Sequence, residues 1–228
     1  MPDAFSRSFD RALVLAALVH AGVARKGTVV PYIIHPVHVA ALLLRYGYTE
    51  PLPTAAVLHD VLEDIDYSDG TLQLAIRSAF PKGGLPDRIL ASDAYRRAFD
   101  VFVSAEFEPG VMSLVHGMTE PRNDDGPPRP WRERKQHTLD HLQNAAPALV
   151  ALKTADALHN VRSILEDIEH HGADVLNRFK AAPADTHWYY ADIADIAVRR
   201  LQAAPIAAEL SRAAEELGRL VAALPPSQ

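Results

Sequence analysis

Apolar residues recur at three- and four-residue steps along almost the whole of this 228-residue chain. The first clear example contains Ala12, Leu15, Val19 and Val23, and Ser8 is its expected N-cap. Nowhere do four or more residues alternate cleanly between apolar and polar, as they would in a half-buried strand. The sequence therefore predicts an all-α fold.

The other expected helices are read from the same spacing. They cover approximately residues 35–46, 53–65, 71–80, 94–104, 111–118, 131–143, 147–159, 161–171, 184–201 and 206–224. The first of them is entered through Pro36 and stopped at Gly47. Segments 81–90 and 121–130 are expected loops because Gly and Pro interrupt them.

Composition excludes several classes of function. The chain has 23 Lys and Arg against 29 Asp and Glu, a net charge of −6, and so lacks the broad basic surface that nucleic-acid binding needs. It contains no cysteine, which excludes disulfides, thiolate zinc sites and a catalytic thiol. Any bound metal must therefore be held by His, Asp or Glu.

The apolar run from Ala12 to Val19 is too short to span a bilayer, and Asp3 and Asp10 precede it in place of a basic segment. We therefore expect a cytoplasmic protein without a membrane partner. Its length fits one domain, over residues 1–228. The sequence leaves the oligomeric state open.

The segment LHDVLEDI, residues 58–65, is the most informative for chemistry. On a continuous helix, at about 100° per residue, His59, Asp60, Glu63 and Asp64 would share one face. Carboxylates so close to one another raise each other's pKa, and a divalent metal would keep them ionised. The alternative is an ordinary solvated helix face.

Two other segments offer matching ligand types. YIIHPVHVA contains His35 and His38, and LKTADALHNVRS contains Asp156 and His159. Asp156 lies in an otherwise apolar stretch, where an unpaired carboxylate would be costly. These segments favour a metal site over a solvated face.

The motifs RKGTVVPYIIHPVHVA, HDVLED and KTADALHNVRS, in this order, resemble those of the HD-domain metal phosphohydrolases. Within that superfamily the chain is most similar to the hydrolase domain of RelA/SpoT-type enzymes and to the small alarmone hydrolases and metazoan SpoT homologues. The resemblance covers residues 20–163, approximately. It implies an HD-type helical bundle with the metal site between helices.

The resemblance implies that His35, His59, Asp60 and Asp156 are the metal ligands. The metal in this family is usually manganese, but two imidazoles and two carboxylates are also compatible with iron or zinc. Glu63 and Asp64 match the family's catalytic pair, which positions and deprotonates the attacking water and handles the leaving-group proton.

Substrate contacts are also implied by the resemblance. Arg25 and Lys26 match a basic pair that can meet nucleotide phosphates. Asn160, four residues after Asp156, matches an Asn that contacts the nucleoside, and Ser163 stands where a small hydroxyl residue is usual.

Three further histidines need an assignment. We expect His20 to pack beside the ligands, and His159 to be a hydrogen-bonded structural residue. His38 could form an HxxH pair with His35, although the family does not use that position.

The expected function is metal-dependent hydrolysis of the 3′-pyrophosphate of guanosine alarmones (ppGpp or pppGpp) to GDP or GTP and pyrophosphate. One alternative is an HD-type phosphatase or phosphodiesterase acting on another nucleotide such as NADPH. A second is a non-catalytic nucleotide-binding module. The chain departs from the family at Ile65 and Ala157 and by a longer segment between Phe80 and Val111, which could reshape the pocket.

Overall fold

The computed structural model describes residues 6–120, 129–178, 181–202 and 204–224, with most of the expected loop 121–130 outside these ranges. The described residues form α-helices, one 3-10 helix and a single isolated bridge between Ala24 and Pro31, without a strand. The predicted all-α fold is confirmed. The chain divides into two compact units, residues 1–119 and 120–228, and each is described by itself.

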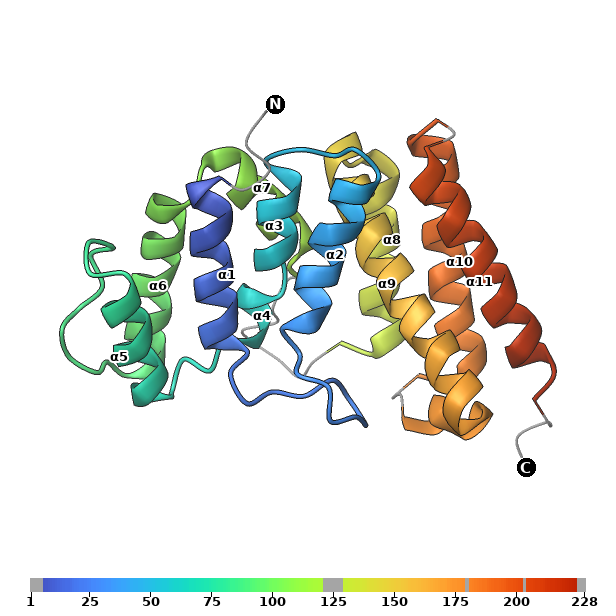
Figure 1. Ribbon diagram of the computed structural model, residues 1–228, viewed down its shortest axis with the longest axis horizontal. Coiled ribbons are helices and arrows are strands. Elements are labelled where there is room, and N and C mark those ends of the chain that lie inside the picture. Colours follow the sequence, from blue (N-terminus) through green and yellow to red (C-terminus); the bar gives the residue numbers. More distant parts are fainter. Residues whose placement is uncertain (1–5, 121–128, 179–180, 203, 225–228) are drawn as a thin grey trace. The chain divides into compact units, whose positions relative to one another are not determined.

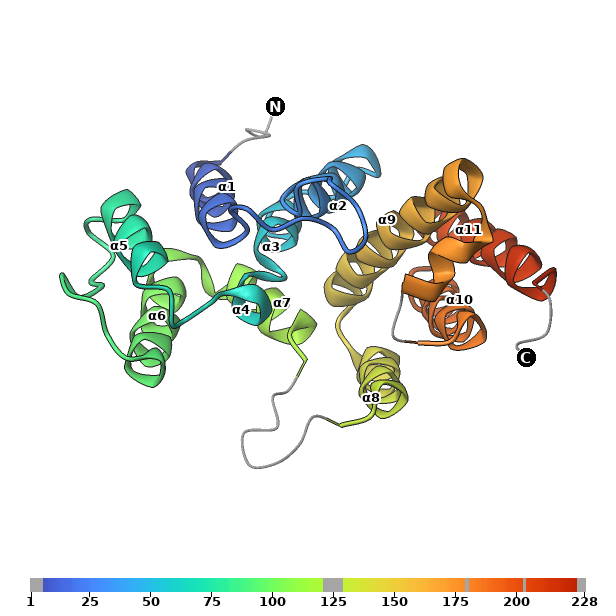
Figure 2. The same cartoon turned by 90° about the horizontal axis from the view of Figure 1, so that it is seen from below.

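The first unit consists of seven helices among its described residues (Figures 1 and 2). They are α1 (Arg7–Val19), α2 (Ile34–Arg45), α3 (Leu52–Leu58), α4 (Val61–Asp64), α5 (Gly70–Ala79), α6 (Ser92–Glu106) and α7 (Pro109–Met118). Helix α3 lies between α1 and α2, contacts both, and also packs on α7 (Figure 1). All residues of α3 are buried, so this short helix forms the centre of the unit.

Helix α1 begins earlier than predicted. Its N-cap is Ser6, whose Oγ accepts a hydrogen bond from the backbone N–H of Phe9 at 3.1 Å, and the expected cap Ser8 lies inside the helix. Phe9 is buried, so the apolar face extends one turn further than the sequence pattern indicated. The capping residue therefore shifts to the position before the lengthened face.

The predicted helix 53–65 is interrupted, so the continuous-helix prediction is wrong. Helix α3 ends at Leu58, α4 begins at Val61, and His59 and Asp60 form the turn between them. His59 Nδ1 hydrogen-bonds the carbonyl oxygen of Ala56 at 2.7 Å. This side-chain bond competes for a carbonyl that a continuous helix would use for its backbone ladder.

The second unit is built from four α-helices and one 3-10 helix in its described part. They are α8 (Trp131–Asn144), α9 (Pro147–His171), η1 (Ala173–Arg178), α10 (Pro183–Arg200) and α11 (Pro205–Ala222). Helices α9, α10 and α11 pack against one another, and α8 packs on α10. An ion pair between Arg162 and Glu209 joins α9 to α11.

The predicted helices 147–159 and 161–171 form the single 25-residue helix α9. The expected break near Asn160 is absent because the Asn160 side chain does not compete with the helix backbone. It donates instead to Asp156 Oδ1, one turn earlier, at 2.7 Å. The remaining predicted helices are confirmed with small shifts at their ends.

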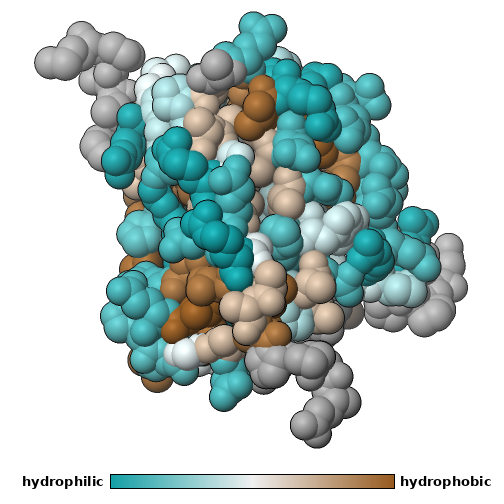
Figure 3. All heavy atoms as spheres, turned by 90° about the vertical axis from the view of Figure 1, so that its right-hand side faces the viewer, coloured by the Kyte–Doolittle hydropathy of each residue, from teal (hydrophilic) through white to brown (hydrophobic). Residues whose placement is uncertain are grey.

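The side of the second unit formed by α10 and α11 is mainly hydrophilic, with hydrophobic side chains gathered in separate patches (Figure 3). In the part of the chain that the structure describes, no helix combines the length and the apolar composition needed to cross a membrane.

Candidate metal centre

Two histidines and one aspartate meet in the first unit. His35 lies in the first turn of α2, and His59 and Asp60 lie in the turn that separates α3 from α4. Both histidines are 3% exposed, and their ring centroids are 5.2 Å apart. Helices α2 and α3 pack against each other, which brings these residues together from separate segments.

The Nε2 atoms of both imidazoles face the Asp60 carboxylate. His59 Nε2 lies 3.1 Å, and His35 Nε2 lies 3.6 Å, from Asp60 Oδ2. Ligand atoms about 2.1 Å from a common ion are about 3–4 Å apart. The spacing of these three groups therefore fits one small divalent cation.

The hydrogen bond of His59 also fits a metal ligand. When Nδ1–H donates to Ala56 O, Nε2 of the neutral ring carries a lone pair. That lone pair then faces the acceptor oxygen of Asp60 at 3.1 Å. Two acceptors at this distance repel each other unless a proton or a cation lies between them.

Tyr32 is hydrogen-bonded to the Asp60 carboxylate. Its hydroxyl donates a hydrogen bond of 2.7 Å to Asp60 Oδ2, and its ring stands between the rings of His20 and His35, at centroid distances of 4.9 and 5.7 Å. A hydrogen bond of this kind orients a ligating carboxylate. Tyr32 therefore holds the Asp60 carboxylate through a defined contact.

His20, the C-cap of α1, packs beside the group without a hydrogen bond to either ring nitrogen in the described residues. Its Nδ1 lies 3.7 Å from Asp64 Oδ2. Burial lowers the pKa of His20 to about 4, against the opposing effect of Asp60. A neutral imidazole packed beside the ligands agrees with the expected role.

Glu63 and Asp64 lie on α4, one short turn beyond His59 and Asp60. Partial burial, together with the charges of Asp60 and Glu63, raises the pKa of Asp64 to about 6. The Asp64 side chain remains 40% exposed. A carboxylate with this pKa can exchange a proton with water near neutral pH.

Arg25 and Lys26 belong to the loop between α1 and α2, which leads directly into the segment of Tyr32 and His35. Backbone hydrogen bonds from Arg25 N to Val30 O, at 2.8 Å, and from Tyr32 N to Val23 O, also at 2.8 Å, fix the shape of the loop. The basic pair is thus carried by an ordered hairpin-like turn.

The second unit contains the remaining predicted residues, on α9. Both oxygens of Asp156 are engaged, Oδ1 by Asn160 Nδ2 at 2.7 Å and Oδ2 by Lys153 Nζ at 2.9 Å. The bond to Asn160 shows that Asp156 and Asn160 lie on the same face of α9. Ser163, less than one turn beyond Asn160, is partly exposed.

Sequence reasoning missed Lys153. Burial lowers the pKa of its ammonium, but the Asp156 carboxylate, together with Tyr189 and Tyr190, outweighs burial and holds the pKa well above its usual value. The available signal was a lysine three residues before a carboxylate in an apolar stretch, where the two side chains meet on one helix face.

The other two candidate histidines differ in exposure. His38 is exposed, whereas His35, one turn earlier on α2, is buried. His159 is 8% exposed on α9, as expected for a packed structural residue. An HxxH ligand pair would require both side chains to face the same ion, and the exposed position of His38 does not favour it.

Comparison with known proteins supports the resemblance found in the motifs. Residues 12–83 match a protein-family model described as HD domain. A search of curated proteins found no match. The family match includes His35, His59 and Asp60, and the resemblance to HD-domain proteins is therefore confirmed.

Solved structures show the same fold. A crystal structure of lmo0812 from Listeria monocytogenes EGD-e is similar with a TM-score of 0.57 and 23% identity, covering 81% of this chain and 99% of that one. A metazoan ortholog of SpoT, described as hydrolysing ppGpp, is similar with a TM-score of 0.57 and 22% identity, covering 94% of this chain and 96% of that one.

Proposed function

Because residues 12–83 match an HD domain, we propose that this chain is a metal-dependent phosphohydrolase that removes the 3′-pyrophosphate of guanosine alarmones. The products are GDP or GTP and pyrophosphate. The proposal of this substrate draws on the similarity to the metazoan ortholog of SpoT, whose description names ppGpp hydrolysis.

The observation that carries the proposed metal chemistry is the convergence of His35 Nε2, His59 Nε2 and Asp60 Oδ2 within the first unit. We assign Asp156 of α9 as the fourth ligand and Mn(II) as the ion. Lys153 and Asn160 hold the Asp156 side chain in place for that role. A divalent ion held by these groups would supply Lewis-acid chemistry, which would polarise a phosphoryl oxygen and activate the attacking water.

Glu63 and Asp64 perform the proton transfers. One carboxylate takes a proton from the attacking water, whose oxygen forms a bond to the phosphorus attached to the ribose 3′-oxygen. The bond between that phosphorus and the 3′-oxygen breaks, and the 3′-oxygen receives a proton as it leaves. The raised pKa of Asp64, about 6, suits it to release and regain a proton near neutral pH.

The remaining predicted residues bind the substrate. Arg25 and Lys26 place two cations on the loop before the first ligand, where they meet the phosphates. Asn160 and Ser163 lie near Asp156 on α9 and contact the nucleoside. No part of the protein needs to become phosphorylated.

The proposal is tested by incubating the purified chain and Mn(II) with ppGpp, NADPH or a deoxynucleoside triphosphate while phosphate and pyrophosphate release are both followed. We expect pyrophosphate and GDP from ppGpp. Release of phosphate from NADPH, without any product from ppGpp, would show that the alternative substrate and not the alarmone is hydrolysed. Nucleotide binding without product in any reaction would support the non-catalytic alternative.

A further inference from the structure

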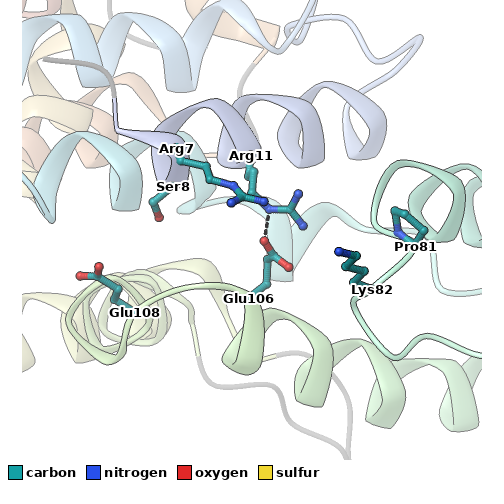
Figure 4. Close-up of a pocket in the computed structure, with 7 residues that line it drawn as sticks. All are labelled: Arg7, Ser8, Arg11, Pro81, Lys82, Glu106 and Glu108. Atoms are coloured by element: carbon teal, nitrogen blue, oxygen red, sulfur yellow. Dashed lines mark hydrogen bonds and ion pairs between the residues drawn. The ribbon is translucent and has the colours of Figure 1, made fainter. Parts of the chain in front are cut away.

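A cavity with a volume of about 470 Å³ lies in the first unit, away from the metal centre (Figure 4). Its walls come from the N-terminal part of α1, from the loop after α5 and from the end of α6 with the start of α7. Cavities of about 300–1,000 Å³ hold small organic ligands. The volume therefore suits a molecule of the size of a nucleoside monophosphate.

One ion pair closes part of the cavity wall. The Arg11 guanidinium binds the Glu106 carboxylate (Figure 4). It also lies 4.5 Å from the centre of the Phe80 ring. These two contacts fix Arg11 and neutralise Glu106. The ion pair thus forms a rigid wall with little net charge.

Two further cations line the cavity. Arg7 comes from the first turn of α1, and Lys82 comes from the loop after α5. Both side chains belong to exposed residues, and among the described residues neither forms an ion pair or hydrogen bond. Their charges are therefore available to an anionic ligand.

Ser8 adds an unpaired hydroxyl. Ser8 lines the cavity, but its Oγ is shielded from solvent and has no hydrogen-bond partner within the described chain. Figure 4 shows its side chain directed from α1 toward the space above Glu108. A buried hydroxyl without a partner is costly.

The charges also limit the ligand. Glu108, at the opposite side from Lys82 in Figure 4, would repel a molecule that is anionic throughout. It can accept a hydrogen bond from a sugar hydroxyl or a base amino group. The N-terminus of α1 favours a negative group beside Arg7 and Ser8.

From these features we propose that the cavity binds a phosphorylated small molecule, with its phosphate at Arg7 and Lys82 and its hydroxyl-bearing part toward Glu108. The chemical class is a phosphomonoester of a nucleoside or sugar.

This cavity is separate from the metal centre. Arg11 and His20 are nine residues apart on α1 and its C-cap, which corresponds to a rise of about 14 Å. The cavity shares no residue with the proposed ligands or with the proposed substrate contacts. Binding at this cavity is therefore independent of the proposed hydrolase activity.

The test is calorimetric titration of the full chain with AMP in the presence of EDTA, with adenosine as the ligand that lacks phosphate. We expect AMP to bind and adenosine to bind at least about tenfold more weakly. Arg25→Gln/Lys26→Gln should leave AMP affinity unchanged, because these two residues belong to the proposed substrate site and do not line the cavity. This variant distinguishes the two sites even if the proposed activity is absent.

The Arg7→Gln/Lys82→Gln variant should lose at least about tenfold in AMP affinity. Arg77→Gln/Arg88→Gln removes the same charge from exposed positions outside the cavity and is the matched control. If the first variant does not fold, Lys82→Gln alone tests the same contact from a loop. Absence of AMP binding by the wild type, or equal affinity in the cavity variant and the wild type, would overturn the proposal.

Discussion

The His59 imidazole has a different partner for each of its nitrogens. Nδ1 binds the carbonyl of Ala56, and Nε2 faces the carboxylate of Asp60. The backbone contact fixes the tautomer, and the tautomer leaves Nε2 with the lone pair that a metal ligand needs. The Asp60 carboxylate is fixed in turn by Tyr32.

Tyr32→Phe removes the hydroxyl that donates to Asp60 and preserves the ring between His20 and His35. We expect Mn(II) affinity to fall about 10- to 100-fold, because loss of a bond that orients a ligand has this cost. Competition with a fluorescent chelator measures the change. Tyr48→Phe, at a tyrosine outside this cluster, is the control, and equal metal affinity in both variants would contradict the role of Tyr32.

Glu63→Gln separates metal binding from catalysis. The substitution removes a proton acceptor on α4 without changing His35, His59 or Asp60, so we expect normal metal content and a loss of about 100-fold in kcat. Elemental analysis and steady-state kinetics provide the two readouts. His38→Gln is the control at an exposed residue. A kcat within about twofold of the wild type would exclude Glu63 from the proton transfers.

His20 makes stability depend on pH in the metal-free protein. Its pKa is about 4 in the fold against 6.5 for a free imidazole, so between these values the unfolded chain binds a proton that the folded chain does not. Above pH 6.5 this proton has little effect on the free energy of unfolding. At pH 5 it lowers the free energy of unfolding by about 2 kcal/mol.

Urea denaturation at pH 7 and pH 5 measures the effect. Asp64, with its raised pKa, changes the free energy of unfolding in the opposite direction. We therefore compare variants: the change in the free energy of unfolding from pH 7 to pH 5 is measured in the wild type and in each variant, and the two changes are subtracted. We expect this difference to be about 2 kcal/mol for His20→Gln and near zero for His38→Gln. Equal pH dependence in His20→Gln and wild type would show that His20 titrates normally.

The family resemblance implied that His35, His59 and Asp60 are neighbours, and the structure brings them together in the first unit. The contact of Lys153 with Asp156 was not predicted because a lysine is usually a solvated surface residue. The function of the residues on α9 remains a proposal.

The interrupted α3 and α4 show how an element differs from its apolar pattern. The spacing of Leu58, Leu62 and Ile65 fits one helix, but the hydrogen bond of His59 to Ala56 ends α3. A helical-wheel angle therefore does not describe how His59 and Asp60 lie relative to Glu63. Helix α9 shows the opposite case, because its Asn160 is satisfied within the helix.

Gly47, after the end of α2, was predicted as a helix stop and has φ of 81°. Gly47→Ala places a Cβ in open space, so its cost comes from backbone conformation alone and should be about 1 kcal/mol. Gly110→Ala is the matched control, since Gly110 lies in α7 and the new Cβ would make an ordinary contact of 3.5 Å with Pro51. Thermal denaturation should show a lowered Tm only for Gly47→Ala. An unchanged Tm for that variant would contradict the expected backbone strain of alanine at this positive φ.

At the scale of the whole molecule, the proposed ligands come from two units of the chain. His35, His59 and Asp60 belong to the first unit, and Asp156 belongs to the second. Sequence motifs predicted all four as one set through a family resemblance, whereas the HD-domain match of residues 12–83 covers only the first three. Whether Asp156 binds the metal therefore decides whether residues of both units take part in the proposed reaction.

The most direct measurement is a calorimetric titration of the metal-free chain with Mn(II), repeated for His59→Ala, Asp156→Asn and the control His38→Gln. We expect one ion per chain in the wild type and in His38→Gln, with affinity reduced at least about 100-fold in the other two variants. Wild-type Mn(II) binding by His59→Ala or by Asp156→Asn would contradict the proposed four-ligand centre.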